Sequence, residues 1–377
     1  MIPFSWRRFG AMVGKEFVQM RRDRLTFGMM VGIPLLQLIL FGYAINSDPR
    51  HLPTAVVQRD YSPFARRVLD AMERTGYFRV VATADGEATA ERWLRRGEVQ
   101  FVVTIPEHFG RDLVRGDRPE VLVEADATDP SATAAALGAT GRLLDAALRT
   151  ELKGPLAELA PPAPAVGFIT HARYNPEGIS QFNVVPGLMG VVLTMTMVVI
   201  TSLAITRERE RGTMENLLAT PVRPAEVLVG KIVPYVLVGY VQITLILLAA
   251  RFLFRVPVGG GLHWVYAAAL VFILANLAMG ITFSTLARNQ LQAMQMSFFF
   301  FLPNILLSGF MFPFRGMPVW AQWIGEALPL THFLRIVRGV MLKGAGLVDV
   351  APQAVPILVF IAVAAAVAMK RYKQTLD

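Results

Sequence analysis

Six long stretches without a formal charge constrain this chain more than any other feature. Each is close to the length of the roughly 20-residue helix that crosses the hydrocarbon layer of a bilayer. The chain of 377 residues is 54% hydrophobic and 17% charged, which is too apolar for an ordinary soluble domain. Helices satisfy their own backbone polar groups in lipid. The sequence therefore predicts six spanning helices, within Leu25–Ser47, Gly178–Thr206, Ile232–Ala250, Val256–Ala287, Asn289–Phe314 and Val350–Met369.

The charges between these stretches predict an orientation. With the N-terminus in the cytoplasm, the inside segments hold 15 Lys and Arg and the short outside segments hold 6. This asymmetry follows the positive-inside rule and places both termini in the cytoplasm. The stretch 48–177 carries 16 Lys and Arg and 19 Asp and Glu, and it then lies outside the cytoplasm. Because the basic excess sits beside the membrane segments, the net charge of +9 does not indicate a nucleic-acid partner.

The parts outside the predicted spans are of two kinds. Residues 1–24 include a helix at 4–20 with Phe9, Met12, Val13 and Phe17 on one face, as expected of a helix lying in the bilayer interface. Residues 48–177 alternate strand-like and helix-like runs, which predicts one small α/β sheet domain inserted between the first two spans. The expected strands are 54–58, 78–83, 99–105 and 120–125, the expected helices are 62–75, 86–96, 107–115 and 130–157, and 161–167 is a stiff proline-rich spacer.

Within the membrane part, residues 25–47 and 178–377, the sequence predicts an outer helical pair and a site of close helix packing. The segment 313–346 is half apolar and interrupted by prolines, so it is predicted to be a re-entrant or surface-lying helical pair at the outer face. In the first span, Gly28 and Gly32 are four residues apart, a spacing that permits close helix packing.

The motifs of an enzyme are absent from the sequence. No phosphate-binding P-loop, zinc-protease motif or nucleophile elbow occurs, and the five histidines are scattered. The chain has no cysteine, which excludes disulfides and thiolate chemistry. We therefore expect no catalytic site, metal or cofactor in this chain.

A dense group of charges directly follows the second apolar stretch. Six charged residues fall between Arg207 and Glu215, and a short amphipathic segment lies between them and two prolines. Thr213 is suited to cap a short helix, Pro221 ends it, and Pro224 begins the next. Such a helix at 207–220 has no core of its own to enter. It is either a docking element for a cytoplasmic partner or a loop whose leucines touch the headgroups.

This region resembles the coupling region of ABC-2 type exporter permeases. The family pattern Glu-Arg-x-x-Gly-Thr-x-Glu with a later proline is matched by Glu208, Arg209, Gly212, Thr213, Glu215 and Pro221, and residues 298–339 are similar to its fifth span and outer helices. The large domain after the first span is similar to the bacterial drug-efflux branch. The resemblance implies a bacterial inner-membrane permease that pairs with a second copy or homologue and with cytoplasmic ATPase subunits, which bind MgATP. The residues expected to couple to the ATPase are Glu208, Arg209, Arg211, Gly212, Thr213, Met214, Glu215, Leu217 and Leu218.

The function expected from these observations is ATP-driven export of an amphipathic small molecule, drug or lipid-like substrate. Candidate path residues are the neutral polar groups of the spans, which serve equally well in helix packing: Thr194, Thr196, Gln295, Asn304 and Ser308. The alternative is a membrane-anchored ligand-binding or sensor protein with 48–177 as its receptor domain. The identity of the substrate, the choice between homodimer and heterodimer, the role of 48–177 and the use of a periplasmic adaptor protein or outer-membrane channel stay open at this stage.

Overall fold

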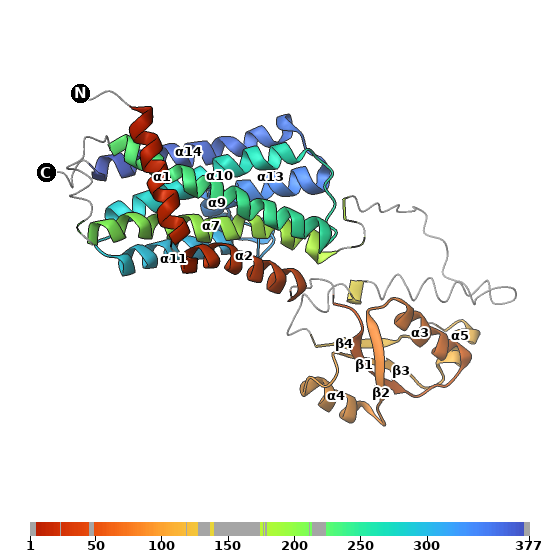
Figure 1. Ribbon diagram of the computed structural model, residues 1–377. Helices are drawn as coiled ribbons and strands as arrows, with labels where there is room; N and C mark the ends of the chain where they lie inside the picture. The colour runs from red at the N-terminus through yellow and green to blue at the C-terminus, as the bar shows by residue number, and fades with distance from the viewer. Residues whose placement is uncertain are drawn as a thin grey trace. The chain divides into compact units, whose positions relative to one another are not determined.

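The chain divides into a helical unit and an α/β unit in the computed structural model (Figure 1). The structure describes residues 5–22, 24–44, 49–117, 119–126, 136–138, 174, 175, 177, 179–210, 212 and 224–372. The helical unit contains the described parts of 1–45 and 180–377, and the α/β unit contains the described parts of 49–126.

Each of the six charge-free stretches overlaps a different helix of the helical unit. The elements of the unit are α1 (Trp6–Arg22), α2 (Arg24–Ala44), α7 (Ser180–Glu210), α9 (Pro224–Phe252), α10 (Leu262–Leu286), α11 (Gln290–Leu307), the 3₁₀ turn η2 (Phe314–Gly316), α12 (Val319–Ala327), α13 (Pro329–Lys343) and α14 (Leu347–Tyr372).

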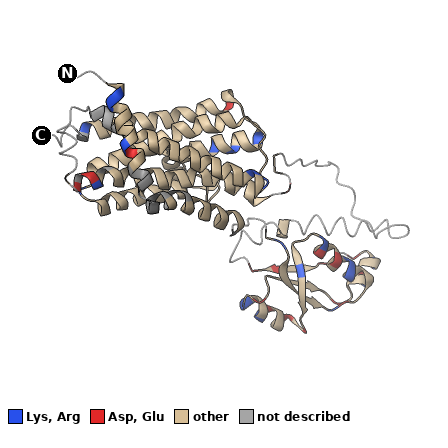
Figure 2. Ribbon diagram, viewed as in Figure 1, with Lys and Arg blue, Asp and Glu red and all other residues tan. Residues whose placement is uncertain are grey.

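Among the described residues, four of these helices are long and apolar enough to cross a membrane: α7, α9, α10 and α14. Their charged residues lie mainly toward the helix ends (Figure 2). In α2 the apolar part that meets these criteria is the shorter Gly32–Tyr43. In α11 three glutamines lie in the first six residues. The first and fifth spans therefore stay predictions, while the mostly helical membrane architecture agrees with the sequence analysis.

The observed helix ends differ from the predicted windows where glycines intervene. The fourth window begins at Val256, but α10 begins at Leu262, after three consecutive glycines. A Cβ on Gly260 would lie 2.6 Å from the backbone oxygen of Val340, so this segment runs tightly against α13. The fifth window extends to Phe314, but α11 ends at Leu307, and Gly309 has a φ of 85° that favours glycine.

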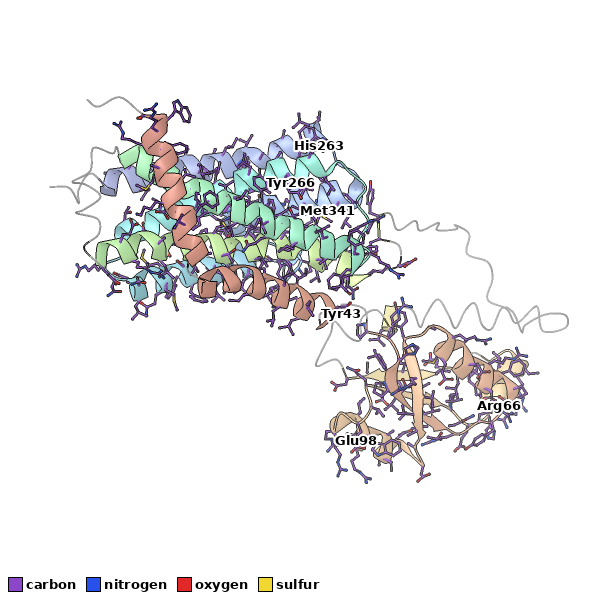
Figure 3. All side chains as sticks on the ribbon, in the orientation of Figure 1. Tyr43, Arg66, Glu98, His263, Tyr266 and Met341 are labelled. Carbon is purple, nitrogen blue, oxygen red and sulfur yellow. The ribbon has the colours of Figure 1, made fainter. Side chains whose placement is uncertain are left out.

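The interior of the helical unit is formed around α7, α10 and α13. The rings of Phe272 and Phe333 stack at 4.2 Å, and side chains fill the space between the helices (Figure 3). A Cβ on Gly280 of α10 would lie 2.9 Å from the backbone oxygen of Val198 in α7. Gly28 and Gly32 were expected to allow such an approach, but nothing lies within 4 Å of a Cβ built on either. Among the described residues, Gly280 makes such a close contact, and the expectation for Gly28 and Gly32 stays a prediction.

The segment predicted as an outer helical pair does form two helices, α12 and α13. On α12, Trp320 and Trp323 are 63% and 75% exposed, which suits side chains at a headgroup layer. By contrast, α13 is largely buried and packs against α7, α10 and α14. The N-terminal helix also differs from a helix lying freely on lipid, because its Met12 is buried against Gly230 of α9.

The α/β unit has the predicted alternation of strands and helices. A four-stranded sheet has the order β2-β1-β3-β4, with β1 parallel to both neighbours and β4 antiparallel to β3. The predicted helix 130–157 and the spacer 161–167 lie outside the described residues, except for 136–138. The elements are β1 (Leu52–Gln58), α3 (Pro63–Arg74), β2 (Phe78–Thr83), α4 (Glu87–Arg95), β3 (Phe101–Ile105), α5 (Phe109–Arg115) and β4 (Leu122–Ala125).

Apolar side chains cover both faces of this sheet. One cluster includes Phe78, Phe101 and Phe109, and a second on the other face includes Val57 and Val102. Alternate residues of β1 and β3 contribute to the two clusters, as the period of a strand requires. A sheet buried on both faces explains the nearly continuous apolar runs in the sequence.

Candidate coupling site

The charged residues after the second apolar stretch continue α7 instead of starting a loop. The helix runs without a break to Glu210, four residues beyond the predicted window, so Arg207 and Glu208 are helical. Gly212 follows with a φ of 67°, a left-handed conformation that favours glycine. The result is a continuous helix that ends in charged residues, followed by a glycine in the left-handed conformation.

The side chain of Glu208 joins α7 to the N-terminal helix. Its carboxylate lies 3.6 Å from the ammonium of Lys15 on α1, and the Glu208 side chain is 12% exposed. Lys15 also lies 3.8 Å from its neighbour Glu16, which is buried. Because α1 packs along α9 through Met12, this pair links the end of α7 to the start of α9.

Glu210 joins α7 to a third part of the bundle. Its carboxylate accepts a hydrogen bond of 2.7 Å from the backbone N–H of Gln290 and another from the Gln290 side-chain amide. These hydrogen bonds lower the pKa of Glu210. Gln290 is the first residue of α11, and Asn289 caps that helix by accepting from the N–H of Gln292. The end of α7 is therefore attached directly to the turn between α10 and α11.

Most of the predicted coupling helix lies outside the described residues. This applies to Thr213, Met214, Glu215, Leu217 and Leu218, and the side chains of Arg209 and Arg211 are likewise not described. The next helix, α9, begins at Pro224, the position at which proline was expected to begin it. The contact face of 213–218 thus stays a prediction, while the end of α7 before it and the start of α9 after it are described.

The candidate path residues fall into two groups. Thr194 and Thr196 lie on α7, where Thr196 donates to Gln242 of α9 at 3.0 Å, and Thr194 bonds the backbone of its own helix. Asn304 is buried on α11, and Ser308 is buried at the C-terminal cap of that helix. Gln295 is exposed and belongs to neither group.

Two contacts give the register of the antiparallel helices α7 and α11. Ser202 and Ser297 share a hydrogen bond of 2.9 Å, and a Cβ on Gly187 would touch Phe310, just beyond α11. Asn304 follows Ser297 by seven residues, and Met195 precedes Ser202 by seven residues. Because the helices are antiparallel, Asn304 lies at the level of Met195. The Oδ1 atom of Asn304 is buried without a hydrogen-bond partner in the described chain. The structure thus aligns Asn304 and Ser308 with the N-terminal half of α7, at the level of the two threonines.

Sequence reasoning missed the residues that complete these contacts. Lys15 was assigned only to a charged face, and Gln290 and Gln242 had no role. A glutamine directly after a helix-capping asparagine is a weak signal, and only the fold brings it to Glu210. Within the described residues, no group of three or more His, Asp or Glu side chains is placed to hold a metal ion.

A bundle of long apolar helices, with charged residues gathered at the end of α7, is the architecture of a multi-pass membrane protein. The chain belongs to the ABC-2 family of transporter proteins, whose family model matches residues 24–370. Proteins of this family are permeases, and their ATPase is a separate subunit. The chain is accordingly a multi-pass inner-membrane permease subunit of an ABC exporter and not an enzyme. This decides against the membrane-anchored sensor that the sequence had left open.

Curated relatives agree with this assignment. The chain is 30% identical over 344 residues to the probable multidrug ABC transporter permease YbhS of Escherichia coli, covering 90% of each chain. It is 26% identical to the probable multidrug permease YbhR of the same organism, over 98% of this chain and 99% of that one. It also matches ABC transporter G family member 20 of Dictyostelium discoideum at 25% identity, over 89% of this chain and 46% of the relative.

Proposed function

We propose that this chain moves an amphipathic small molecule, drug or lipid-like substrate out of the cytoplasm or the inner leaflet. Two permeases, identical or homologous, work with two cytoplasmic ATPase subunits that bind MgATP. Both termini lie in the cytoplasm, and 48–177 lies on the opposite side. The multidrug names of two relatives support a drug-like or amphipathic cargo.

The observation that carries the coupling part of this proposal is the double attachment of the end of α7. Glu208 contacts α1, and Glu210 contacts the first residue of α11. A displacement of the segment 207–220 by an ATPase is therefore passed to three helices at once. Rigidity is essential here, since a flexible loop would absorb the movement. The helical continuity of α7 to Glu210 provides that rigidity.

In this proposal, movement of α7 relative to α11 drives transport. The path residues Thr194, Thr196, Asn304 and Ser308 lie along α7 and α11. A shift of α7 against α11 changes the partners available to these polar groups. A substrate with a few polar atoms on an apolar body suits such a lining.

The experiment that tests the coupling role compares three single glutamate substitutions. The full chain, purified with its ATPase and reconstituted in liposomes, is assayed for ATP hydrolysis and for transport of a fluorescent amphipathic dye. Glu208→Ala and Glu210→Ala should lower the transport obtained for each ATP hydrolysed. The matched control is Glu98→Ala, in the α/β unit (labelled in Figure 3), where Glu98 pairs only with the exposed Arg96. Equal coupling ratios in all four proteins would contradict the proposal.

A further inference from the structure

Among the described residues of the helical unit, Arg338 has buried N–H donors without a hydrogen-bond partner. Arg338 lies on α13, and its Nη1 atom donates to the backbone oxygen of Gly309 at 3.0 Å. Its Nε and Nη2 atoms are fully buried and have no hydrogen-bond partner in the described chain. No salt bridge is formed by Arg338 in the residues that the structure covers. A positive charge is thus enclosed with one of its edges unpaired.

The neighbouring arginine of the same helix, Arg335, has its charge paired with a carboxylate. Arg335 forms two hydrogen bonds to the carboxylate of Glu326, at 2.6 and 2.9 Å. It also lies over the ring of Phe314. Arg338, one turn further on, has no such carboxylate. The two residues therefore provide a matched pair, one neutralised within the chain and one not.

The unpaired atoms of Arg338 have a specific geometry. The Nε–H and one N–H of Nη2 point from the same edge of the planar guanidinium, in parallel. A carboxylate or phosphate accepts such a pair of hydrogen bonds with two of its oxygens. The remaining nitrogen, Nη1, holds the group in place through Gly309. The free edge is therefore oriented in advance for a planar or tetrahedral anion.

The surroundings of this edge are apolar and closely packed. A Cβ on Gly187 of α7 would lie 3.3 Å from Nη2 and 2.6 Å from the ring of Phe310. The absence of a side chain at Gly187 thus gives Nη2 its space. Phe310 is 8% exposed and belongs to the main apolar cluster of the helical unit. A molecule that reaches this edge would place its uncharged part among such side chains.

Leaving the edge unpaired is costly, and this argues for a ligand. A buried charge without a partner destabilises a protein by several kcal/mol. Ionisable side chains in the apolar interior of membrane proteins are rare and usually serve a ligand or transport path. Arg338 also lies beside the α7–α11 path, near the level at which α11 ends. Nearer the centre of that path, Asn304 has its Oδ1 atom unpaired as well.

We propose that Arg338 binds the carboxylate or phosphate of an anionic amphiphile through its Nε and Nη2 edge. Both atoms are covered in the present conformation, so binding requires the segment around Phe310 to move. Gly309, with its φ of 85°, is the residue of that segment to which Arg338 is bonded. The binding site rests on the geometry alone; that the bound molecule is exported rests on the proposed function.

The test measures binding without the ATPase, so its outcome is separate from that of the coupling proposal. The full chain in phosphatidylcholine nanodiscs is titrated with radiolabelled oleate and with oleyl alcohol, which has the same tail and no charge. Arg338→Gln should weaken oleate binding at least tenfold and leave oleyl alcohol binding unchanged. Arg338→Lys keeps the charge without the pair of parallel N–H donors, so its oleate affinity should lie between those of the wild type and Arg338→Gln. The control Arg335→Gln should bind oleate as the wild type does.

A second arm identifies the source of the anion. If phosphatidylglycerol in the nanodisc competes with oleate in the wild type but has no effect in Arg338→Gln, a lipid headgroup occupies the site. If it does not compete, the site prefers free amphiphiles; both results support an anion site. Equal oleate affinity in the wild type, Arg338→Gln and Arg338→Lys would overturn the proposal. So would loss of the dimer in Arg338→Gln with oleate affinity unchanged, because the partner of Arg338 would then be a carboxylate of a second subunit.

Discussion

Enlarging Gly280 should separate α10 from α7 and destabilise the helical unit. A Cβ at this position would lie 2.8 Å from Cβ of Thr201, 2.9 Å from the backbone oxygen of Val198 and 3.3 Å from the backbone nitrogen of Ser202. Ordinary carbon contacts are about 3.5–4.0 Å, and backbone atoms cannot turn aside as a side chain can. Gly280→Ala therefore forces the two helices apart by several tenths of an ångström, and Gly280→Leu by more.

The magnitude follows from two opposing effects. Overpacking a tight interior costs about 1–3 kcal/mol. Replacing glycine by alanine inside a helix returns up to about 1 kcal/mol. The alanine variant should thus lose about 0–2 kcal/mol, and the leucine variant should lie at or above the upper end of the overpacking range. At about 2–4 °C per kcal/mol for a unit of roughly 150–250 residues, Gly280→Leu should lower the unfolding midpoint of the helical unit by several degrees.

Thermal unfolding in detergent, followed by the fluorescence of the five tryptophans, measures this effect. The matched control is Gly32 of α2, where a Cβ meets nothing within 4 Å. Gly32→Ala should leave the midpoint unchanged or raise it. If Gly280→Leu melts at the wild-type temperature, or Gly32→Ala is the more damaging change, the packing of α7 on α10 described above is wrong.

Three further predictions concern the coupling segment, pH and topology. Leu217→Asp should insert normally but reduce co-purification with the ATPase, because a charge buried in an apolar groove costs several kcal/mol; full recovery of the ATPase would contradict this. Hydrogen bonds from Arg335 lower the pKa of Glu326 below its ordinary value of 4.5, so their stabilisation is present above that value and lost as the pH falls through the folded-state pKa. The melting midpoint of the wild type should therefore fall more steeply below pH 4.5 than that of Glu326→Gln, and parallel curves would refute it. In the cysteine-free chain, a cysteine at Ser131 should react with an impermeant thiol reagent on spheroplasts and one at Thr375 should not; the reverse pattern would invert the topology.

Much of the fold could be predicted because local patterns determine it. Runs of apolar residues gave all four strands to within two residues at either end, and the charge-free stretches gave the long helices. The late start of α10 could also be explained from sequence, since three glycines precede Leu262. Pro224 and Gly212 took the positions that their restricted or permissive backbones suggested.

The parts that could not be predicted depend on pairs of residues far apart in the chain. Lys15 and Glu208 are separated by about half the sequence, and only the packing of α1 on α9 brings them together. Gly280 could not be singled out because one glycine in an apolar run has no periodic signal, whereas the spaced pair in α2 has one although this chain places nothing within 4 Å of a Cβ on either glycine. The unpaired edge of Arg338 is visible only once the surroundings of α13 are known.

The central claim is that residues 207–220 receive the movement of a cytoplasmic ATPase. Site-specific photo-crosslinking in native membranes tests it most directly, with benzoyl-phenylalanine placed at Leu217 and, as a control, at the exposed Trp323 of α12. The account predicts an adduct at Leu217 that mass spectrometry identifies as an ABC ATPase, formed in a nucleotide-dependent amount, and no such adduct at Trp323. An ATPase adduct at Trp323, or none at Leu217 while the ATPase still co-purifies with the chain, would contradict it.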